Sequence, residues 1–457
     1  MSVDVLDPES RALVDSALQH ARAIRAEIAR LEARDFVLTL PHAVLEEIAR
    51  RADVEIASIR ALPNDPTFAS PSVPTVERLD ALATRVAALR HLHSLLSLLS
   101  RVHSSRLPFE LVRPFEGLAA QLLQVDSTSL LLRPFEEYFF CIRPWAGPDG
   151  LLSMGRSEAL ENSFCVMCPS AEVGTFRLFA ILAHELGHPL YQRRVLEGVT
   201  DDLGAAVGRA RAELFPTPPG GEPTDIDLPG ALGTLSKWTE EVFCDLVGTR
   251  LLGPAYASAF HSTLPVFWMP EGDENYPSSC LRMAAIEAGL TRWWSNVSSL
   301  RPVLDAYPLQ RESLLSCPAP NDTALRIATH ALTTTREGET SGAQAAHSLF
   351  DVLLSRIEEH VPTPGSWPDF ASTVLRAAER IADLTPPDPY LLERERTFAS
   401  HELVAFAFIS SGLGRQAAFD RWQTCYDWRE SKCNSVLADL SLKGLEASDM
   451  QRRHRSR

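Results

Sequence analysis

The seven residues Ala183-His-Glu-Leu-Gly-His-Pro189 decide how the whole chain is interpreted. The apolar turns before them predict an interior helix over about residues 175–188. Positions i and i+4 lie on one face of a helix, so His184 and His188 can direct two imidazole nitrogens at one metal ion. Glu185 lies about 100° around this helix, where it can reach a water molecule at the metal without being a ligand.

Chance explains this pentad poorly, because His-Glu-x-x-His is expected only about 0.03 times in a chain of this composition. The alternative is a buried helix whose histidines only satisfy hydrogen bonds. Two histidines and a glutamate are costly inside an apolar helix unless a partner compensates for their burial. A metal ion is such a partner, and we therefore expect one zinc ion at this helix.

A catalytic zinc site needs a third protein ligand, and the segment Lys237-Trp-Thr-Glu-Glu-Val-Phe-Cys-Asp245 predicts a second helix that supplies it. Glu241 and Asp245 lie at i and i+4 on this helix. We expect Glu241 to be the third ligand and Asp245 to accept the free N–H of a ligating histidine, which fixes the tautomer of that histidine. Glu240 is the rival ligand, but its own i+4 neighbour, Cys244, makes a poorer supporting group.

The motif His184-Glu185-Leu-Gly-His188 followed by Glu241-x-x-x-Asp245 resembles the zincin metallopeptidases, and within them the gluzincins. The resemblance covers about residues 105–315 and implies a zincin-like core with a small mixed sheet and an active-site helix. It implies a hydrolase of peptide bonds in which Glu185 is the general base on a zinc-bound water. It also implies that the strand over residues 163–168 is the edge strand that pairs with an extended substrate.

The same resemblance suggests further groups near the site. The segment Asn275-Tyr-Pro-Ser-Ser-Cys-Leu-Arg282 is similar to a His-Pro…Arg segment of several zincins, with tyrosine in place of histidine. Tyr276 and Arg282 are thereby candidates for binding the oxyanion or the substrate, and His261 is a further candidate. The alternative is a loop tyrosine and a helix-surface arginine. Pro189 directly follows the second histidine and is expected to end or kink the metal helix there.

Eight cysteines at irregular spacings do not make a disulfide framework, so we expect reduced thiols. Cys165 and Cys168 have the spacing of a metal knuckle, but no second pair exists, and residues three apart on a strand face opposite sides. Ordinary packing is therefore the expected role of both cysteines.

The chain is predicted to be helical on both sides of this core. Over residues 14–31, and again in a later stretch, apolar residues recur every three or four positions. We expect a helical hairpin or small bundle over residues 1–105, with a dimerising coiled coil as the alternative. The zincin-like domain is then expected over 106–317, a helical region over 318–447 and a basic disordered tail over 448–457. The predicted fold class is α+β, predominantly helical.

Composition and charge limit the classes of function. The chain of 457 residues has 44 Lys and Arg against 59 Asp and Glu, a formal charge of −15, which argues against a nucleic-acid partner. The N-terminus lacks the basic and apolar regions of a signal peptide, and no apolar run approaches the roughly 18 residues of a membrane span. We therefore expect a cytoplasmic protein that has no membrane partner.

The leading hypothesis is a zinc-dependent metallopeptidase, a hydrolase acting on a peptide or protein substrate. The alternative is a zinc-binding, zincin-fold regulatory or interaction protein that has little or no proteolytic activity and acts through its helical flanks. A third reading is a helical scaffold without metal. In the first hypothesis the helical flanks shape or restrict the cleft. Binding of a protein partner, or self-association, through these flanks is a further possibility.

Overall fold

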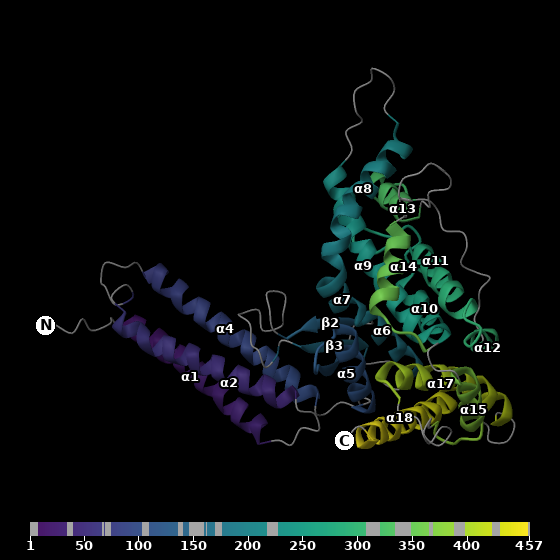
Figure 1. Cartoon of the computed structure of the whole chain (residues 1–457). Coiled ribbons are helices and arrows are strands. Elements are labelled where there is room, and N and C mark those ends of the chain that lie inside the picture. The colour runs from purple at the N-terminus through teal and green to yellow at the C-terminus, as the bar shows by residue number, and fades with distance from the viewer. Residues whose placement is uncertain are drawn as a thin grey trace. The chain divides into compact units, whose positions relative to one another are not determined.

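The structure, a computed structural model, is dominated by helices and contains a three-stranded sheet among the residues that it describes (Figure 1). The predicted fold class, α+β and predominantly helical, is confirmed at this level. The described residues are 8–33, 40–65, 68, 75–102, 109–135, 140–145, 160, 162–169, 176–216, 227–307, 320–333, 349–364, 369–387, 398–422 and 430–455.

By the contacts within the chain, the residues fall into two compact units. The first unit comprises residues 1–107, 129–134 and 143–165. The second comprises residues 108–128, 135–142 and 166–457. The domain boundaries expected at residues 105 and 317 stay predictions.

The first unit contains three long helices, α1 (Pro8–Glu32), α2 (Leu40–Ala61) and α4 (Thr75–Val102), and each packs on the other two. A short 3-10 turn, η1 (Leu62–Asn64), follows α2. The apolar positions that recur along α1 are all buried, which explains why this helix packs lengthwise on its neighbours. These positions are Val14, Ala17, Ala21, Ile24, Ile28 and Leu31.

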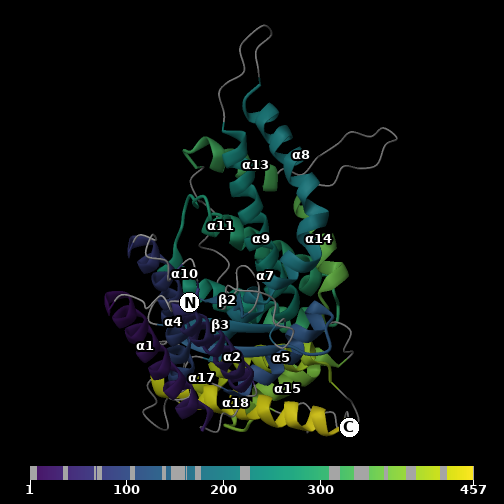
Figure 2. The same cartoon turned by 90° about the vertical axis from the view of Figure 1, so that its left-hand side faces the viewer.

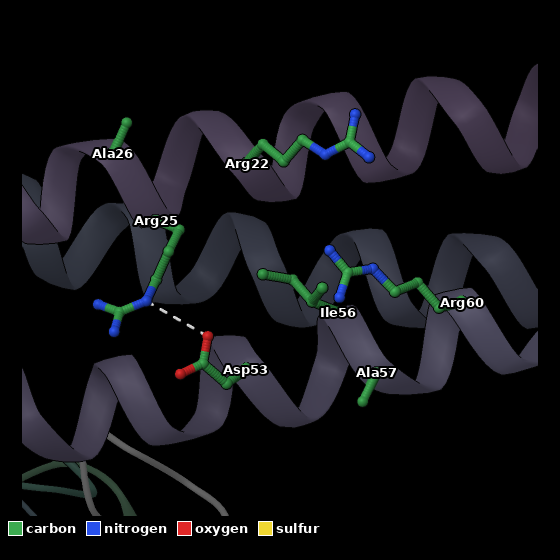
Figure 3. Close-up of a pocket in the computed structure, with 7 residues that line it drawn as sticks. All are labelled: Arg22, Arg25, Ala26, Asp53, Ile56, Ala57 and Arg60. Carbon is green, nitrogen blue, oxygen red and sulfur yellow. Dashed lines mark ion pairs between the residues drawn. The ribbon is translucent and has the colours of Figure 1, made fainter.

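A surface groove of about 500 Å³ runs between α1 and α2 of this bundle (Figure 3). Arg22 and Arg25 reach it from α1, and Asp53 and Arg60 reach it from α2. The Nε atom of Arg25 lies 3.3 Å from Oδ1 of Asp53. An exposed ion pair of this kind contributes little to stability, so the buried apolar positions of the helices hold the bundle together.

The sheet consists of β1 (Ser129–Phe135), β2 (Cys141–Pro144) and β3 (Ser163–Pro169), and the boundary between the two units passes through these strands. The strand order is β1-β3-β2, so β3 has a neighbour on each side. The expectation that residues 163–168 form an edge strand is therefore wrong. Every residue of β3 is buried, which is typical of a strand covered on both faces.

The second unit is built from many helices, and most of them lie between residue 176 and the C-terminus. Before residue 300 these are α5 (Phe109–Leu123), η4 (Phe176–Ile181), α6 (Leu182–Glu185), α7 (Gly187–Leu190), the π turn η5 (Tyr191–Val195), α8 (Leu196–Leu214), α9 (Leu228–Leu252), α10 (Pro254–Phe267), α11 (Ser279–Leu290) and the π turn η6 (Thr291–Ser295). After residue 300 they are α12 (Arg301–Ala306), α13 (Thr323–Thr333), α14 (Leu349–His360), α15 (Phe370–Ala382), α17 (Ser400–Trp422) and α18 (Glu430–Arg455).

Helix α9 is the core of this second unit, and Figure 2 shows it among α8, α11, α13 and α14. It begins at a cap in which the side chain of Asp227 accepts a hydrogen bond from the amide of Gly230. It ends at Gly253, whose φ of 50° lies in the left-handed region that favours glycine. A Cβ atom at this position would lie 2.2 Å from the ring of Trp294. The helix is therefore fixed at both ends by local geometry.

The helices at the C-terminal end pack on the rest of the second unit. Helix α17 contacts α15, α18, α5 and α9, and α18 also contacts α5. Among the described helices, none combines the length and the apolar character that a membrane span requires.

The cysteines differ from the expectation at one position. Cys280 is disulfide-bonded, so the expectation of reduced thiols throughout the chain is wrong there. Cys165 and Cys168 are buried thiols of β3 that lie outside any disulfide. Burial raises the pKa of Cys168 to about 12, in keeping with the packing role expected for it.

A bidentate ion pair between Glu358 and Arg292 joins α14 to the π turn η6. The Nε and Nη2 atoms of Arg292 lie 2.6 Å and 3.0 Å from the carboxylate oxygens of Glu358, and the indole N–H of Trp293 donates to the same carboxylate. The hydrogen bond from Arg292 is the main reason that the pKa of Glu358 falls to about 2.

We expect Glu358→Gln to lower the melting temperature at pH 7, because the pKa of Glu358 is lower in the folded chain than in the unfolded one. The ion pair is fully formed above the ordinary pKa of 4.5 and is lost as the pH falls towards 2. The difference between wild type and variant, measured by circular dichroism, should therefore shrink across this interval. Glu359→Gln is the control, since that exposed neighbour contacts only residues of its own helix among the described residues, Arg356 one turn away and the adjacent His360. A difference that stays constant between pH 7 and pH 2 would contradict this assignment.

Candidate metal centre

The metal helix is one continuous helical run over residues 176–214, with 3-10, α and π geometry in turn. Pro189 was expected to end or kink this helix; the helix does not end there, but its geometry changes from α to π directly after the proline. Proline has no N–H to donate to the carbonyl of Glu185, which breaks the α-helical ladder. The chain compensates with the π turn Tyr191–Val195 and then continues as α8.

The two histidines of this helix direct their Nε2 atoms towards one carboxylate of α9. The Nε2 atom of His184 lies 3.4 Å from Oε2 of Glu241, and the Nε2 atom of His188 lies 3.9 Å from Oε1 of the same residue. The imidazole rings are 5.2 Å apart and nearly perpendicular. His184 is 5% exposed and His188 is half-buried. The structure thus brings together the three residues expected to bind zinc.

The other ring nitrogen of each histidine is held by a second carboxylate. Nδ1 of His184 lies 2.9 Å from Oδ1 of Asp245, as the sequence predicts for Asp245. Nδ1 of His188 lies 2.9 Å from Oε1 of Glu240, a contact that the sequence analysis missed. In a neutral histidine whose Nδ1–H is donated to such a carboxylate, the Nε2 lone pair is left for a metal. Glu240 therefore orients the ring of His188, and Glu241, the next residue, occupies the predicted ligand position.

The electrostatics of this cluster favour a positive charge between the rings and Glu241. Burial by itself lowers the pKa of His184, but the hydrogen bonds to Asp245 and Glu241 outweigh burial and raise it to about 10. Burial by itself raises the pKa of Glu241. The neighbouring His184 and Arg282 lower this pKa by more, so it falls below its ordinary value. A cation is therefore stabilised where these groups meet.

Glu185 occupies a different position from the other carboxylates. It is 5% exposed and makes no hydrogen bond or ion pair with any described residue. Burial is the largest cause of its raised pKa, and the two histidines oppose the rise only in part. A buried carboxylate with a raised pKa has the properties of a general base or acid.

Arg282 lies at the site and is not a helix-surface residue. Its Nε and Nη2 atoms each lie 2.7 Å from an oxygen of Asp245, which makes a bidentate ion pair. Its Nη2 atom also lies 3.6 Å from Oε2 of Glu241, and its guanidinium covers the ring of Phe260. This ion pair is the main reason that the pKa of the fully buried Asp245 is lowered despite its burial.

Tyr276 lies on the solvent side of the site, in the loop before α11. It is 45% exposed, and its pKa is raised first by burial and then by the carboxylates of Glu241 and Glu185. The side chain of Asp273 accepts hydrogen bonds from the amides of Asn275 and Tyr276, which fixes the turn that carries the tyrosine. The carboxylates of Glu241 and Glu185 thus act on the Tyr276 hydroxyl electrostatically, and no hydrogen bond joins this hydroxyl to the site among the described residues.

The last candidate, His261, is half-buried on α10. No hydrogen bond or ion pair joins it to the site within the described residues. Sequence reasoning also missed Tyr256, whose hydroxyl lies 2.5 Å from Oδ1 of Asp245. Its position relative to Asp245, eleven residues away, depends on the turn between α9 and α10, and no sequence motif marks it.

Cys244 offers a second possibility for the third ligand. Ligand atoms of His184, His188 and Cys244 all lie within 4.8 Å of one another. Glu241 fits better, because its two oxygens face both Nε2 atoms, whereas the Cys244 sulfur is packed against Gly187. A Cβ atom built on Gly187 would lie 2.8 Å from both Cα and Sγ of Cys244.

Comparisons with protein-family models, with curated proteins and with solved structures find no match to this chain. The zincin family therefore remains a resemblance carried by the two motifs. What the structure adds is a group of residues with the geometry of a metal site, in which His184, His188 and either Glu241 or Cys244 could hold an ion.

We expect Gly187→Ala to lower the free energy of unfolding by about 1–3 kcal/mol, because the added methyl would overlap the backbone of Cys244. Gly204→Ala on α8 is the matched control, since a Cβ atom there has open space. That control should gain about 0.5–1 kcal/mol from helix propensity. Denaturant unfolding measures both values, and equal gains in the two variants would show that the close contact is absent.

We expect Glu241→Gln to weaken zinc binding at least about 100-fold, because it removes the charged donor that faces both Nε2 atoms. Cys244→Ala should change the zinc dissociation constant by less than about threefold if its thiol is not a ligand. Competition with a chromophoric chelator measures both constants. A greater loss in Cys244→Ala than in Glu241→Gln would identify the His-His-Cys set as the ligands.

Proposed function

We propose that this protein is a zinc-dependent metallopeptidase that hydrolyses peptide bonds, with Glu185 as the general base that activates water. The observation that carries the proposal is the orientation of both histidines. Their Nε2 atoms face Glu241 while their Nδ1 atoms are held by Asp245 and Glu240. Ligating histidines in metal sites commonly show this pattern.

The donor set also fits zinc in charge and type. The site has four carboxylates, Glu185, Glu240, Glu241 and Asp245, against the guanidinium of Arg282. With both imidazoles neutral these groups carry a net charge of −3, which favours binding of a divalent cation. Two imidazole nitrogens and one carboxylate are a usual protein ligand set for catalytic zinc, and they leave a position open for water. When bound, zinc would supply Lewis-acid activation of a water molecule and of the scissile carbonyl.

The residues of the chain then have separate tasks. Glu185 takes the proton of the attacking water and delivers it to the nitrogen of the leaving amine, which its burial and raised pKa favour. The hydroxyl of Tyr276 donates a hydrogen bond to the carbonyl oxygen as negative charge develops on it. Both the Nε and Nη2 edges of Arg282 are used by Asp245, so we assign Arg282 to holding Asp245 in place.

We expect Glu185→Gln to abolish cleavage of a proteome-derived peptide library, with a loss of at least about 100-fold in rate, because a general base contributes that much or more. Bound zinc, measured by elemental analysis, should be unchanged, since Glu185 is not a ligand in this assignment. Glu197→Gln, on an exposed position of α8, is the control and should cleave like wild type.

Two outcomes would contradict the proposal. Absence of zinc from protein purified without chelator, and no uptake on titration, would remove the metal. Zinc uptake with zero cleavage by both wild type and Glu185→Gln would favour the alternative, a zinc-binding regulatory protein.

A further inference from the structure

We infer that Tyr256 is a positioning residue of this metal centre, which holds the Asp245 carboxylate in the orientation that fixes the tautomer of His184. The inference rests on the proposed function, because it concerns the affinity of the same site for its metal. Tyr256 does not face the proposed ligand position. It acts through Asp245. The hydrogen-bonded chain that begins at the proposed ligand His184 thus continues through Asp245 to Tyr256 on α10.

The hydroxyl of Tyr256 meets both partners. Its oxygen lies 2.5 Å from Oδ1 of Asp245 and 3.3 Å from Nδ1 of His184. Tyr256 and Asp245 are both 0% exposed, so water does not reach this hydrogen bond. A buried phenol requires an acceptor, and a buried carboxylate requires donors. The pair satisfies both requirements.

The number of donors around Asp245 explains why the hydroxyl matters. Within the described part of the chain, Oδ1 of Asp245 is contacted by His184 Nδ1, Tyr256 OH and Arg282 Nη2, while Oδ2 is contacted by Arg282 Nε alone. Arg282 therefore holds the carboxylate from one side across both oxygens. Tyr256 holds it from another side, at the oxygen that His184 uses. Without the hydroxyl, the ion pair with Arg282 alone sets the rotation of the carboxylate, and the bond to His184 is less constrained.

The backbone of α9 lies close against the ring of Tyr256. The chain turns at Gly253, so that α10 packs back on α9. At Gly248 of α9, a Cβ atom would lie 2.6 Å from Cδ2 of the Tyr256 ring. The ring thus lies directly against the α9 backbone, one turn from Asp245, and its hydroxyl has a fixed position. Side-chain rotation of Tyr256 is restricted before the metal binds, which is the condition for preorganisation.

The chain offers a matched control in Tyr191. This tyrosine is 1% exposed and lies one helical turn after His188. Its hydroxyl is buried and has no hydrogen-bond partner among the residues that the structure describes. Tyr191→Phe and Tyr256→Phe remove the same atom from two buried rings near the site, and only the second change affects Asp245.

The test is the zinc dissociation constant of the full-length chain, measured by competition with a chromophoric chelator. We expect Tyr256→Phe to weaken zinc binding by about 3- to 10-fold, less than the 10- to 100-fold that loss of a direct support such as Asp245 typically causes. Tyr191→Phe should bind zinc like wild type. The visible absorption bands of Co²⁺ bound in place of zinc should shift in Tyr256→Phe and not in Tyr191→Phe.

The melting temperature of each chelator-treated variant separates positioning from folding. A variant that is merely destabilised melts earlier without metal and keeps the Co²⁺ spectrum of wild type. Gly248→Ala, which displaces the ring of Tyr256 while keeping its hydroxyl, should also weaken zinc binding.

Equal zinc affinity in Tyr256→Phe and wild type would overturn the inference and leave the metallopeptidase proposal standing. An equal loss in Tyr256→Phe and Tyr191→Phe would overturn it as well. If wild type takes up no zinc, the proposed function fails, and the positioning role fails with it.

Discussion

The burial of one carboxylate, Asp245, is the constraint on which the rest of this site depends. An ionised group taken out of water is costly unless opposite charge and hydrogen bonds compensate for the lost hydration. Three different helical segments provide that compensation: α6 with His184, α10 with Tyr256 and α11 with Arg282. Because all three must reach one side chain, the helices around the middle of α9 are fixed relative to one another.

The same requirement explains the small residues at this place. Gly187 lets α7 lie against the backbone of α9 at Cys244, and Gly248 gives the ring of Tyr256 its place on α9. The close approach of the helices at these glycines brings the hydrogen-bond donors to Asp245, and these hydrogen bonds in turn hold the helices together. A displaced helix would leave a buried charge without its donor, which is more costly than a lost apolar contact.

The parts of the site that the sequence predicted are those that depend on spacing along one helix. His184 and His188 share a face because they are four residues apart, and Glu241 and Asp245 are related in the same way. Once α6 was expected to face α9, the contact between Asp245 and His184 could be predicted from these spacings. Spacing could not show that Glu240 supports His188, since this depends on how α7 and α9 are rotated against each other. The same is true of Tyr256, whose place is set by a turn and by an absent side chain at Gly248. The central position of β3 depends on pairing with strands that carry little pattern of their own.

The π turn after His188 has a consequence for the whole metal helix. A π turn holds one residue more than an α turn, so every side chain beyond it is rotated by about 100° relative to an uninterrupted helix. The segments before and after Tyr191–Val195 thus present different sequence faces to the same neighbour, and both α7 and α8 pack on α9. The periodic pattern of apolar residues shifts at this turn. The sequence therefore suggests two separate helices where the structure has one continuous helical run. Deleting a single residue of the π turn would remove its extra residue and make the helix regular, while the buried side of α8 would still face α9.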